Sequence, residues 1–173
     1  MLLCVLGLGS NKPYSDLSSK ELIVRAAEEL HITLTGIRLS PVYKTAPLHI
    51  TDQAAFYNAA VSGFFDEEKQ EKTNSENARK LLGIIQEIEA RYGRDRRIER
   101  RWGERSLDID ILLYGDHVIS ETDLLIPHPR LNERAFALRP LLDLLPNATE
   151  PGTGILYRDI LAGLGDQEIT SLS

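Results

Sequence analysis

The sequence predicts an α+β fold, in which helices cover a mainly antiparallel sheet. Two segments, which follow Ser18 and Thr73, have the apolar spacing of amphipathic helices. Other segments are short and β-prone, and one of them, Leu107–Tyr114, alternates apolar and polar residues as a strand does. Helices and strands do not follow one another in a repeated βαβ order, so an antiparallel sheet under helices is the most economical arrangement.

The N-terminal part of the chain is predicted to form a strand, a helix and a second β region. The apolar run 2–8 is typical of a buried strand. Ser18 begins a Ser-x-x-Glu capping box, which predicts a helix that extends to about His31. The β-prone segment 37–44 follows, and Pro41 within it is typical of an edge strand or a bulge.

The rest of the chain adds a strand, a long helix and several shorter elements. The apolar segment 57–65 predicts a strand, whereas the polar segment 66–76 is predicted to be a surface insertion. Thr73 begins a second capping box, and the helix after it has the cleanest apolar period in the chain and ends near Gly93. A short strand and two partly helical segments complete the prediction: 117–119, 133–145 and 157–164.

The composition is that of a single domain spanning residues 1–173. Apolar residues make up 42% of the chain and charged residues 27%, and the net charge is −6. The only cysteine, Cys4, lies in an apolar run, so we expect it to be a buried hydrophobe with no internal disulfide. The first residues lack a basic start and a long apolar stretch. We therefore expect no signal peptide, no membrane partner and a cytoplasmic location.

Positive charge is concentrated in one segment of this acidic chain. Between Arg91 and Arg105 there are seven arginines and three carboxylates, so this segment has a net charge of +4 and the remainder −10. Such a patch attracts anions. The acidic remainder would repel a long polyanion, so we expect a small, highly charged ligand and no nucleic-acid partner.

The segment that follows the arginines carries two carboxylates on one strand face. Asp108 and Asp110 are two positions apart, so their Cα atoms lie roughly 6.6–6.8 Å apart. At an effective dielectric near 20 their repulsion is on the order of 2–2.5 kcal/mol. A solvent-facing pair has the same pattern, but the nearby arginines favour a site for magnesium and a polyphosphate. The other face is predicted to point to the core: Leu107, Ile109, Ile111 and Leu113.

Other common nucleotide and catalytic motifs are not found in the sequence. No G-x-x-x-x-G-K-[ST] segment occurs, and Gly7-x-Gly9 lacks the third glycine of a dinucleotide fingerprint. Nor is there a Gly-x-Ser-x-Gly elbow or a zinc-type cysteine and histidine cluster. Three residues keep both a structural and a ligand-binding interpretation, namely Asn58, Trp102 and His128.

The segment RWGERSLDIDIL resembles the signature of the 6-hydroxymethyl-7,8-dihydropterin pyrophosphokinase family, with the Gly, the Arg and the D-x-D at the family's spacing. Further similar segments follow in the family's order along nearly the whole chain: LGLGSN, YKTAPLHITDQAAFYNAAV, IEARYGRDRR and LLIPHPRLNERAFALRPLLDLLP. The resemblance implies a ferredoxin-like α+β sandwich. It also implies pyrophosphate transfer from ATP to the hydroxymethyl group of 6-hydroxymethyl-7,8-dihydropterin, with release of AMP, in folate biosynthesis.

The resemblance further implies roles for individual residues, with ATP as co-substrate. Asp108 and Asp110 match the pair that holds two Mg²⁺ ions. Arg94, Arg96 and Arg105 match phosphate-handling catalytic positions, within an arginine-rich loop, 93–106, that is expected to be mobile. The implied pterin-binding residues are Thr45, Leu48, Phe56, Asn58, Trp102 and Phe136. The implied nucleotide contacts are Gln86, Glu89, Ile111, His128 and Arg134.

The sequence leaves several alternatives open. The arginine loop carries one residue more than in some relatives, so Arg96 and Arg97 compete for one phosphate position. No dedicated histidine base is expected, and Asp110 is the candidate for proton acceptance. An RNA-binding module that uses the arginine patch, and a non-catalytic relative that binds without turnover, are the alternative functions. No obligate protein partner is predicted.

Overall fold

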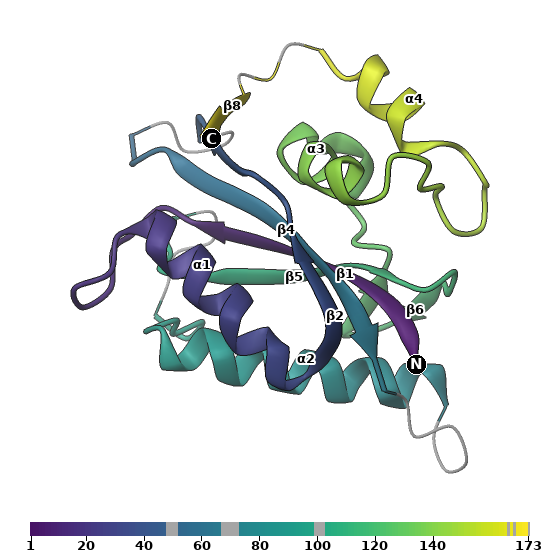
Figure 1. The fold of residues 1–173 in the computed structure, drawn as a ribbon, viewed down its shortest axis with the longest axis horizontal. Coiled ribbons are helices and arrows are strands. Elements are labelled where there is room, and N and C mark those ends of the chain that lie inside the picture. The colour runs from purple at the N-terminus through teal and green to yellow at the C-terminus, as the bar shows by residue number, and fades with distance from the viewer. Residues whose placement is uncertain (48–51, 67–72, 99–102, 166, 168, 173) are drawn as a thin grey trace.

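The computed structural model describes residues 1–47, 52–66, 73–98, 103–165, 167 and 169–172 (Figure 1). Its centre is a six-stranded antiparallel sheet in the order β5–β1–β4–β3–β8, and β2 also pairs with β4. The two edge strands of this order are β5, which follows the arginine loop, and β8, which lies near the end of the chain.

The topology of the sheet is that of a ferredoxin-like fold. The central strand β1, Leu2–Ser10, lies between β4, Phe56–Phe65, and β5, Asp108–Tyr114. Two short strands, β2, Leu34–Leu39, and β3, Val42–Thr45, pair with successive parts of β4. One helix follows β1 and another follows β4. With β2 and β3 taken as one interrupted strand, because both pair with β4, the elements up to β5 have the βαββαβ order of this fold. The predicted α+β class with a mainly antiparallel sheet is confirmed.

Both long helices begin at the predicted capping boxes and lie on one face of the sheet (Figure 1). Ser18 caps α1, Ser19–Glu29, which continues as a 3₁₀ turn, Leu30–Ile32. Thr73 caps α2, Asn74–Arg91. In each box the cap hydroxyl accepts a backbone hydrogen bond and a glutamate bonds back to the cap residue, which satisfies two otherwise unpaired amide groups.

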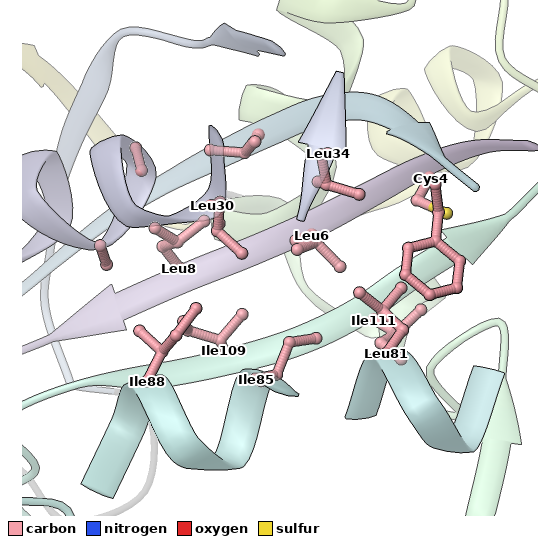
Figure 2. Packing of buried hydrophobic residues seen from close by; sticks show 14 of the residues in the cluster. Cys4, Leu6, Leu8, Leu30, Leu34, Leu81, Ile85, Ile88, Ile109 and Ile111 are labelled. Atoms are coloured by element: carbon pink, nitrogen blue, oxygen red, sulfur yellow. The ribbon is translucent and has the colours of Figure 1, made fainter. Parts of the chain in front are cut away.

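The main core lies between these helices and the sheet (Figure 2). Leu6 and Leu8 of β1 and Ile109 of β5 pack in one cluster with Ile85 and Ile88 of α2. All five side chains are at most 2% exposed. Cys4 is fully buried in the same cluster, as a small hydrophobe is expected to be.

A second core lies on the opposite face of the sheet. It contains α3, Ala135–Leu144, which includes Pro140, and α4, Tyr157–Gly163, with a 3₁₀ turn, Leu131–Glu133, before α3. The buried residues of this second cluster come from both the sheet and the helices: Val5, Ala60, Leu112, Leu113, Leu131, Ala137, Leu138, Leu141, Leu144 and Tyr157.

The prediction that Leu113 shares the core face of Ile109 is wrong. The register between β1 and β5 shifts between Val5, which pairs with Leu113, and Leu6, which pairs with Ile111. Leu112 is therefore the extra residue of a β-bulge, and both Leu112 and Leu113 pack in the second cluster. A bulge adds one residue to one strand, so the alternation of faces reverses beyond it.

Two strands lie where the sequence predicts none. One is β7, Leu124–Ile126, which forms a hairpin with β6, Ile119–Glu121. The other is β8, Ile169–Leu172, which pairs with β3 at the edge of the sheet. The predicted β region 37–44 is divided into β2 and β3, with Pro41 between the two strands.

The predicted surface insertion falls mainly outside the described residues. Of segment 66–76, residues 67–72 are not described, and residues 74–76 form the first turn of α2. The insertion therefore stays a prediction. Within the described ranges, no helix is both long and apolar enough to cross a membrane.

Candidate active site

A cavity of about 340 Å³ opens at one end of the sheet, on the side of α3. Its floor includes Gly7 and Gly9 of β1, which pair with Asp110 and Asp108 of β5. A Cβ atom at Gly7 would lie 3.1 Å from a methyl carbon of Leu112, and one at Gly9 would lie 3.4 Å from Oδ1 of Asn58. The two glycines therefore let the side chains of Leu112 and Asn58 lie close to β1, a role unrelated to a dinucleotide fingerprint.

Asp108 lies among arginines at one side of this cavity. Its carboxylate is 2.7 Å from Nη1 of Arg105, 3.2 Å from Nη2 of Arg94 and 3.9 Å from Nη2 of Arg96. Burial alone would raise the pKa of Asp108, but the charges of Arg105, Arg94 and Arg96 outweigh burial and lower it. Asp108 is therefore ionised and holds the three guanidinium groups together.

Asp110 has a different environment from its neighbour on the same strand face. Oδ2 of Asp110 is 3.6 Å from Nη1 of Arg134 and 3.9 Å from Nε2 of His128. Desolvation in the cavity wall and the negative charge of Asp108 raise the pKa of Asp110 to about 7. The arginines around Asp108 thus offset both its burial and the repulsion from Asp110. At Asp110, burial and the repulsion from Asp108 outweigh the attraction of Arg134.

The two predicted aromatic residues, Phe56 and Phe136, both line the cavity, and each contacts an arginine. Cζ of Arg105 lies 5.8 Å from the ring centroid of Phe56, and Cζ of Arg134 lies 5.6 Å from the ring centroid of Phe136. These are cation–π contacts. The arginines that face the two carboxylates therefore also pack on the two aromatic rings.

Asn58 and Thr45 form the polar part of the cavity wall between the rings and the sheet. Nδ2 of Asn58 donates to Oγ1 of Thr45 over 2.8 Å, and both residues are only 6% exposed. Asn58 is the third residue of β4, inside the strand, so it does not cap the strand start. Both residues line the cavity, so the other hydrogen-bonding groups of the Asn58 amide and the Thr45 hydroxyl can bind the polar edge of a ligand.

His128 lies in the cavity wall as a neutral imidazole at pH 7. Burial and the charge of Arg134 lower the pKa of His128 to about 4. Its Nδ1 accepts a hydrogen bond from the backbone N–H of Arg130 over 3.1 Å. Its Nε2 lies 3.4 Å from the donor Nη1 of Arg134 and 3.9 Å from Oδ2 of Asp110, so the role of Nε2 as donor or acceptor depends on the tautomer of the ring.

The predicted nucleotide contacts on α2 lie beside a second, shallower hollow. This hollow is lined by the exposed Gln86, by Glu89 and by residues 93–97. Glu89 is only 1% exposed, and its Oε1 accepts the backbone N–H of Ile109 over 2.8 Å, while Arg96 forms an ion pair with it. Glu89 therefore joins α2, β5 and the arginine loop.

Two of the remaining predicted positions, Ile111 and Arg96, lie within the described residues, and two, Leu48 and Trp102, do not. The side chain of Ile111 packs in the main core (Figure 2), so a ligand contact of this residue would come through its backbone. Arg96 lines the cavity, whereas the side chain of Arg97 is 88% exposed and pairs with Asp95, so the geometry favours Arg96 as the phosphate ligand. Leu48 and Trp102 lie outside the described residues, as do residues 99–102 of the arginine loop.

Asn11, which the sequence indicates only as the end of the first strand, connects three segments of the site. Its Nδ2 donates to Oε1 of Gln53 and to the carbonyl oxygen of Ala54, over 3.2 and 3.1 Å. Its Oδ1 accepts the backbone N–H of Arg105 over 2.9 Å, and the backbone N–H groups of Asn11 and Lys12 both donate to the carbonyl oxygen of Arg105. Asn11 is 2% exposed. A buried hub of this kind depends on tertiary contacts and has no signature in sequence spacing.

Comparison with known proteins gives a consistent assignment. The sequence profile of the family described as 7,8-dihydro-6-hydroxymethylpterin-pyrophosphokinase (HPPK) matches residues 5–146. The 2-amino-4-hydroxy-6-hydroxymethyldihydropteridine pyrophosphokinase of Bacillus subtilis (strain 168) is 36% identical over 151 residues, which cover 86% of this chain and 81% of that protein.

Larger proteins contain a similar domain. The folate synthesis bifunctional protein of Arabidopsis thaliana is 40% identical over 141 residues, which are 82% of this chain but only 26% of that protein. The chain therefore spans about a quarter of the length of this relative. The crystal structure of Plasmodium falciparum HPPK-DHPS with SDX-DHP has the same fold, with a TM-score of 0.64 and 18% identity over 94% of this chain and 43% of that one. From the profile match and the bacterial relative, the chain belongs to the 7,8-dihydro-6-hydroxymethylpterin-pyrophosphokinase family.

Proposed function

We propose that this chain transfers the pyrophosphoryl group of ATP to the hydroxymethyl group of 6-hydroxymethyl-7,8-dihydropterin and releases AMP. One observation carries the proposal beyond family membership. A single cavity has two aromatic rings and a buried amide at one part and two carboxylates among arginines at the other. A flat heterocycle with amide edges suits the first part, and a metal-bound polyphosphate suits the second.

The pterin would occupy the part of the cavity lined by Phe56 and Phe136. Aromatic rings bind a flat heterocycle through stacking, and the amide of Asn58 matches the donors and acceptors on a pterin edge. The hydrogen bond between Asn58 and Thr45 holds this amide in one orientation. Leu48 and Trp102 complete the proposed pterin site, and both lie outside the described residues.

The triphosphate would lie over the aspartates. Arg94, Arg96 and Arg105 on the side of Asp108, and Arg134 on the side of Asp110, supply guanidinium groups for its oxygens. In the tautomer that carries its proton on Nε2, His128 would donate to a phosphate oxygen. The arginines are already gathered by Asp108, so little rearrangement of charge is needed when phosphate arrives.

Two Mg²⁺ ions are part of this proposal, and the residues present fit them. Within the described residues, no group of three or more His, Cys, Asp or Glu side chains could hold a metal ion. Asp108 and Asp110 instead provide the one or two carboxylates that Mg²⁺ uses together with phosphate oxygens. Burial and the charge of Asp108 raise the pKa of Asp110 although Arg134 lies 3.6 Å away, so a further cation beside this carboxylate would be favourable. When bound, the ions would neutralise phosphate charge and lower the pKa of the attacking hydroxyl.

The proposed reaction requires positioning more than covalent catalysis. The hydroxyl oxygen of the pterin attacks the β-phosphorus of ATP and gives up its proton, for which Asp110 is the candidate acceptor. The bond from this phosphorus to the bridging α,β-oxygen breaks, and AMP leaves with that oxygen. Transfers of this kind depend on alignment of the two oxygens and on stabilisation of charge. The residues of this chain would align the pterin through Phe56, Phe136 and Asn58, and the phosphates through the arginines.

AMP release from ATP and Mg²⁺, with and without 6-hydroxymethyl-7,8-dihydropterin, tests the function. Pterin-dependent AMP is expected. ADP in place of AMP would mean an ordinary kinase reaction, and binding of both ligands without product would mean a non-catalytic relative. Salt-sensitive binding of RNA with no product would instead favour the nucleic-acid alternative.

Asn58→Ala is expected to raise the KM for pterin by about 10–100-fold, with a smaller change in the KM for ATP. A site that hydrogen-bonds a polar ligand edge loses about 1–3 kcal/mol when one buried partner is left unpaired. Steady-state kinetics with each substrate varied gives both constants. Asn147→Ala, at an exposed position after α3, is the matched control and should behave as wild type. An equal change in both KM values would contradict a pterin-specific role of Asn58.

Asn11→Asp is expected to lower kcat/KM for both substrates by about 10–100-fold. The substitution keeps the acceptor for the N–H of Arg105 but places an oxygen against the oxygens of Gln53 and Ala54. Asn11→Ala removes the bonds without this repulsion and should be milder. Initial rates and thermal melting of both variants, beside Asn147→Asp, decide the question. Unchanged kcat/KM in Asn11→Asp would show that the site does not depend on this hub.

A further inference from the structure

The last residues of the chain lie outside the family match, which ends at residue 146, yet they contact both sides of the cavity. The strand β8 pairs with β3, which ends at Thr45 in the cavity wall. The side chain of Gln167, just before this strand, reaches the start of α3, which provides Phe136 and Ala137 to the opposite wall. Strand β8 forms the edge of the sheet beside β3, and in Figure 1 it lies apart from α4.

Gln167 forms two hydrogen bonds that enclose Arg134. Its Oε1 accepts the backbone N–H of Ala135 over 3.1 Å, and its Nε2 donates to the carbonyl oxygen of Glu133 over 3.2 Å. Arg134 occupies the N-cap position of α3 and makes no side-chain capping bond of its own. The amide of Gln167 therefore supplies a cap from elsewhere in the chain and fixes the peptide groups on both sides of Arg134.

Arg134 is the residue of α3 for which a fixed backbone matters most. Its guanidinium lies 3.6 Å from Asp110 and 5.6 Å from the ring centroid of Phe136, so it contacts both parts of the cavity. A long arginine side chain keeps one such geometry only if its own backbone is held. The two bonds of Gln167 provide this restraint.

The other end of the segment is held by strand pairing. Ile169 pairs with Thr45, and Thr170 pairs with Lys44. Only two residue steps separate Gln167 from Ile169, and two extended residues span at most about 7 Å. The chain between them therefore sets an upper limit on the distance from Gln167, at the start of α3, to Ile169, at the edge of β3.

We propose that Gln167 is a positioning residue and that Gln167 and β8 together form a strap between the two walls of the cavity. The strap limits how far the Arg134–Phe136 wall can move from the Thr45–Asn58 wall, so that a flat ring stays in contact with both. This inference rests on the proposed function, because the ring is taken to be the pterin. It assigns substrate positioning to a segment outside the residues that the family profile matches.

The test compares Gln167→Ala and Gln167→Glu with Thr170→Ala in the full chain. Thr170 has an exposed side chain in β8, so its replacement keeps the strand pairing and controls for substitution in this segment. Gln167→Ala is expected to raise the KM for pterin about five- to tenfold, with kcat within threefold and a melting temperature within about 4 °C of that of Thr170→Ala, because a lost helix cap has only a small effect on stability. Gln167→Glu keeps the acceptor for Ala135 N–H, and because the bond to Glu133 is exposed, the new carboxylate oxygen can turn to water instead of facing the Glu133 carbonyl, so its KM should be intermediate.

Amide hydrogen exchange supplies a readout that does not depend on turnover. In the ligand-free chain, Gln167→Ala should increase the exchange rate of the Ala135 amide at least tenfold, whereas Thr170→Ala should not. A pterin KM within twofold of wild type in Gln167→Ala would overturn the strap, and so would equal effects of Gln167→Ala and Thr170→Ala. If wild type forms no AMP, the proposed function fails. Exchange at Ala135 then still reports whether Gln167 holds α3, and unchanged exchange would overturn that contact as well.

Discussion

Replacement of Asp108 or Asp110 by asparagine should abolish AMP formation, and the two substitutions should shift the stability of the ligand-free protein in opposite directions. Both carboxylates are needed for the proposed Mg²⁺ ions, whose charge stabilisation amounts to several kcal/mol. Since each 1.36 kcal/mol is a factor of ten in rate, we expect each variant to lose about three orders of magnitude in kcat.

The opposite effects on stability follow from the charges around each carboxylate. Asp108 is ionised among Arg94, Arg96 and Arg105, and its pKa is lower in the folded chain than in the unfolded chain. Its charge therefore stabilises the fold at pH values above the unfolded pKa, and this stabilisation is lost as pH falls through the folded pKa. Asp108→Asn should therefore lower the melting temperature. The pKa of Asp110 is raised to about 7, so ionisation of Asp110 destabilises the fold. This loss of stability grows as pH rises from the ordinary aspartate pKa to about 7 and is complete above it. Asp110→Asn should raise the melting temperature at pH 8.

Melting of both variants at pH 8 without metal, and AMP formation with Mg²⁺, check this prediction. A shift of about 2–4 °C is expected for each kcal/mol in a chain of this size. Asp116→Asn, at an exposed position after β5, is the control for loss of one carboxylate. Near-normal turnover of Asp110→Asn with both substrates bound would contradict the metal-centred account.

The sequence predicts the parts of this molecule that local patterns determine. Both capping boxes begin their helices at the expected residues because the cap and its glutamate are three positions apart and satisfy each other's backbone groups. The aspartates lie on one face of β5, toward the cavity, because alternation in a strand is strict until a bulge interrupts it.

The sequence does not predict features that depend on distant segments. The bulge at Leu112 results from the register against β1, and this register reverses the faces of Leu113 and Tyr114. Strand β8 has only four residues, of which two are polar, and its pairing with β3 depends on tertiary structure. The unequal environments of Asp108 and Asp110 likewise come from arginines on two separate segments, since Arg94 and Arg105 lie in the arginine loop and Arg134 lies at the start of α3.

Arg105 is expected to be the arginine whose loss affects both parts of the site. Nη1 of Arg105 binds Asp108 over 2.7 Å, its guanidinium packs on Phe56, and its backbone is held by Asn11. Arg105→Lys keeps the charge but loses the planar fork and the stacked face. We expect this variant to lose about 10²-fold in kcat and to raise the KM for pterin severalfold. Arg105→Ala, which also loses the charge, should lose about 10³-fold in kcat.

Arg97 provides the matched control, because it lies in the same loop and its side chain is 88% exposed and paired with Asp95. Arg97→Lys and Arg97→Ala change the same chemical groups at a position outside the cavity. If the loop acts only through its total positive charge, Arg97→Ala and Arg105→Ala will lose equal activity, and raising the salt concentration will weaken binding equally in both. If placement decides, Arg105→Lys will be far worse than Arg97→Ala although it keeps its charge. The ion pair with Asp108 and the contact with Phe56 require the second result, since a single guanidinium that faces both substrates cannot be replaced by charge elsewhere in the loop.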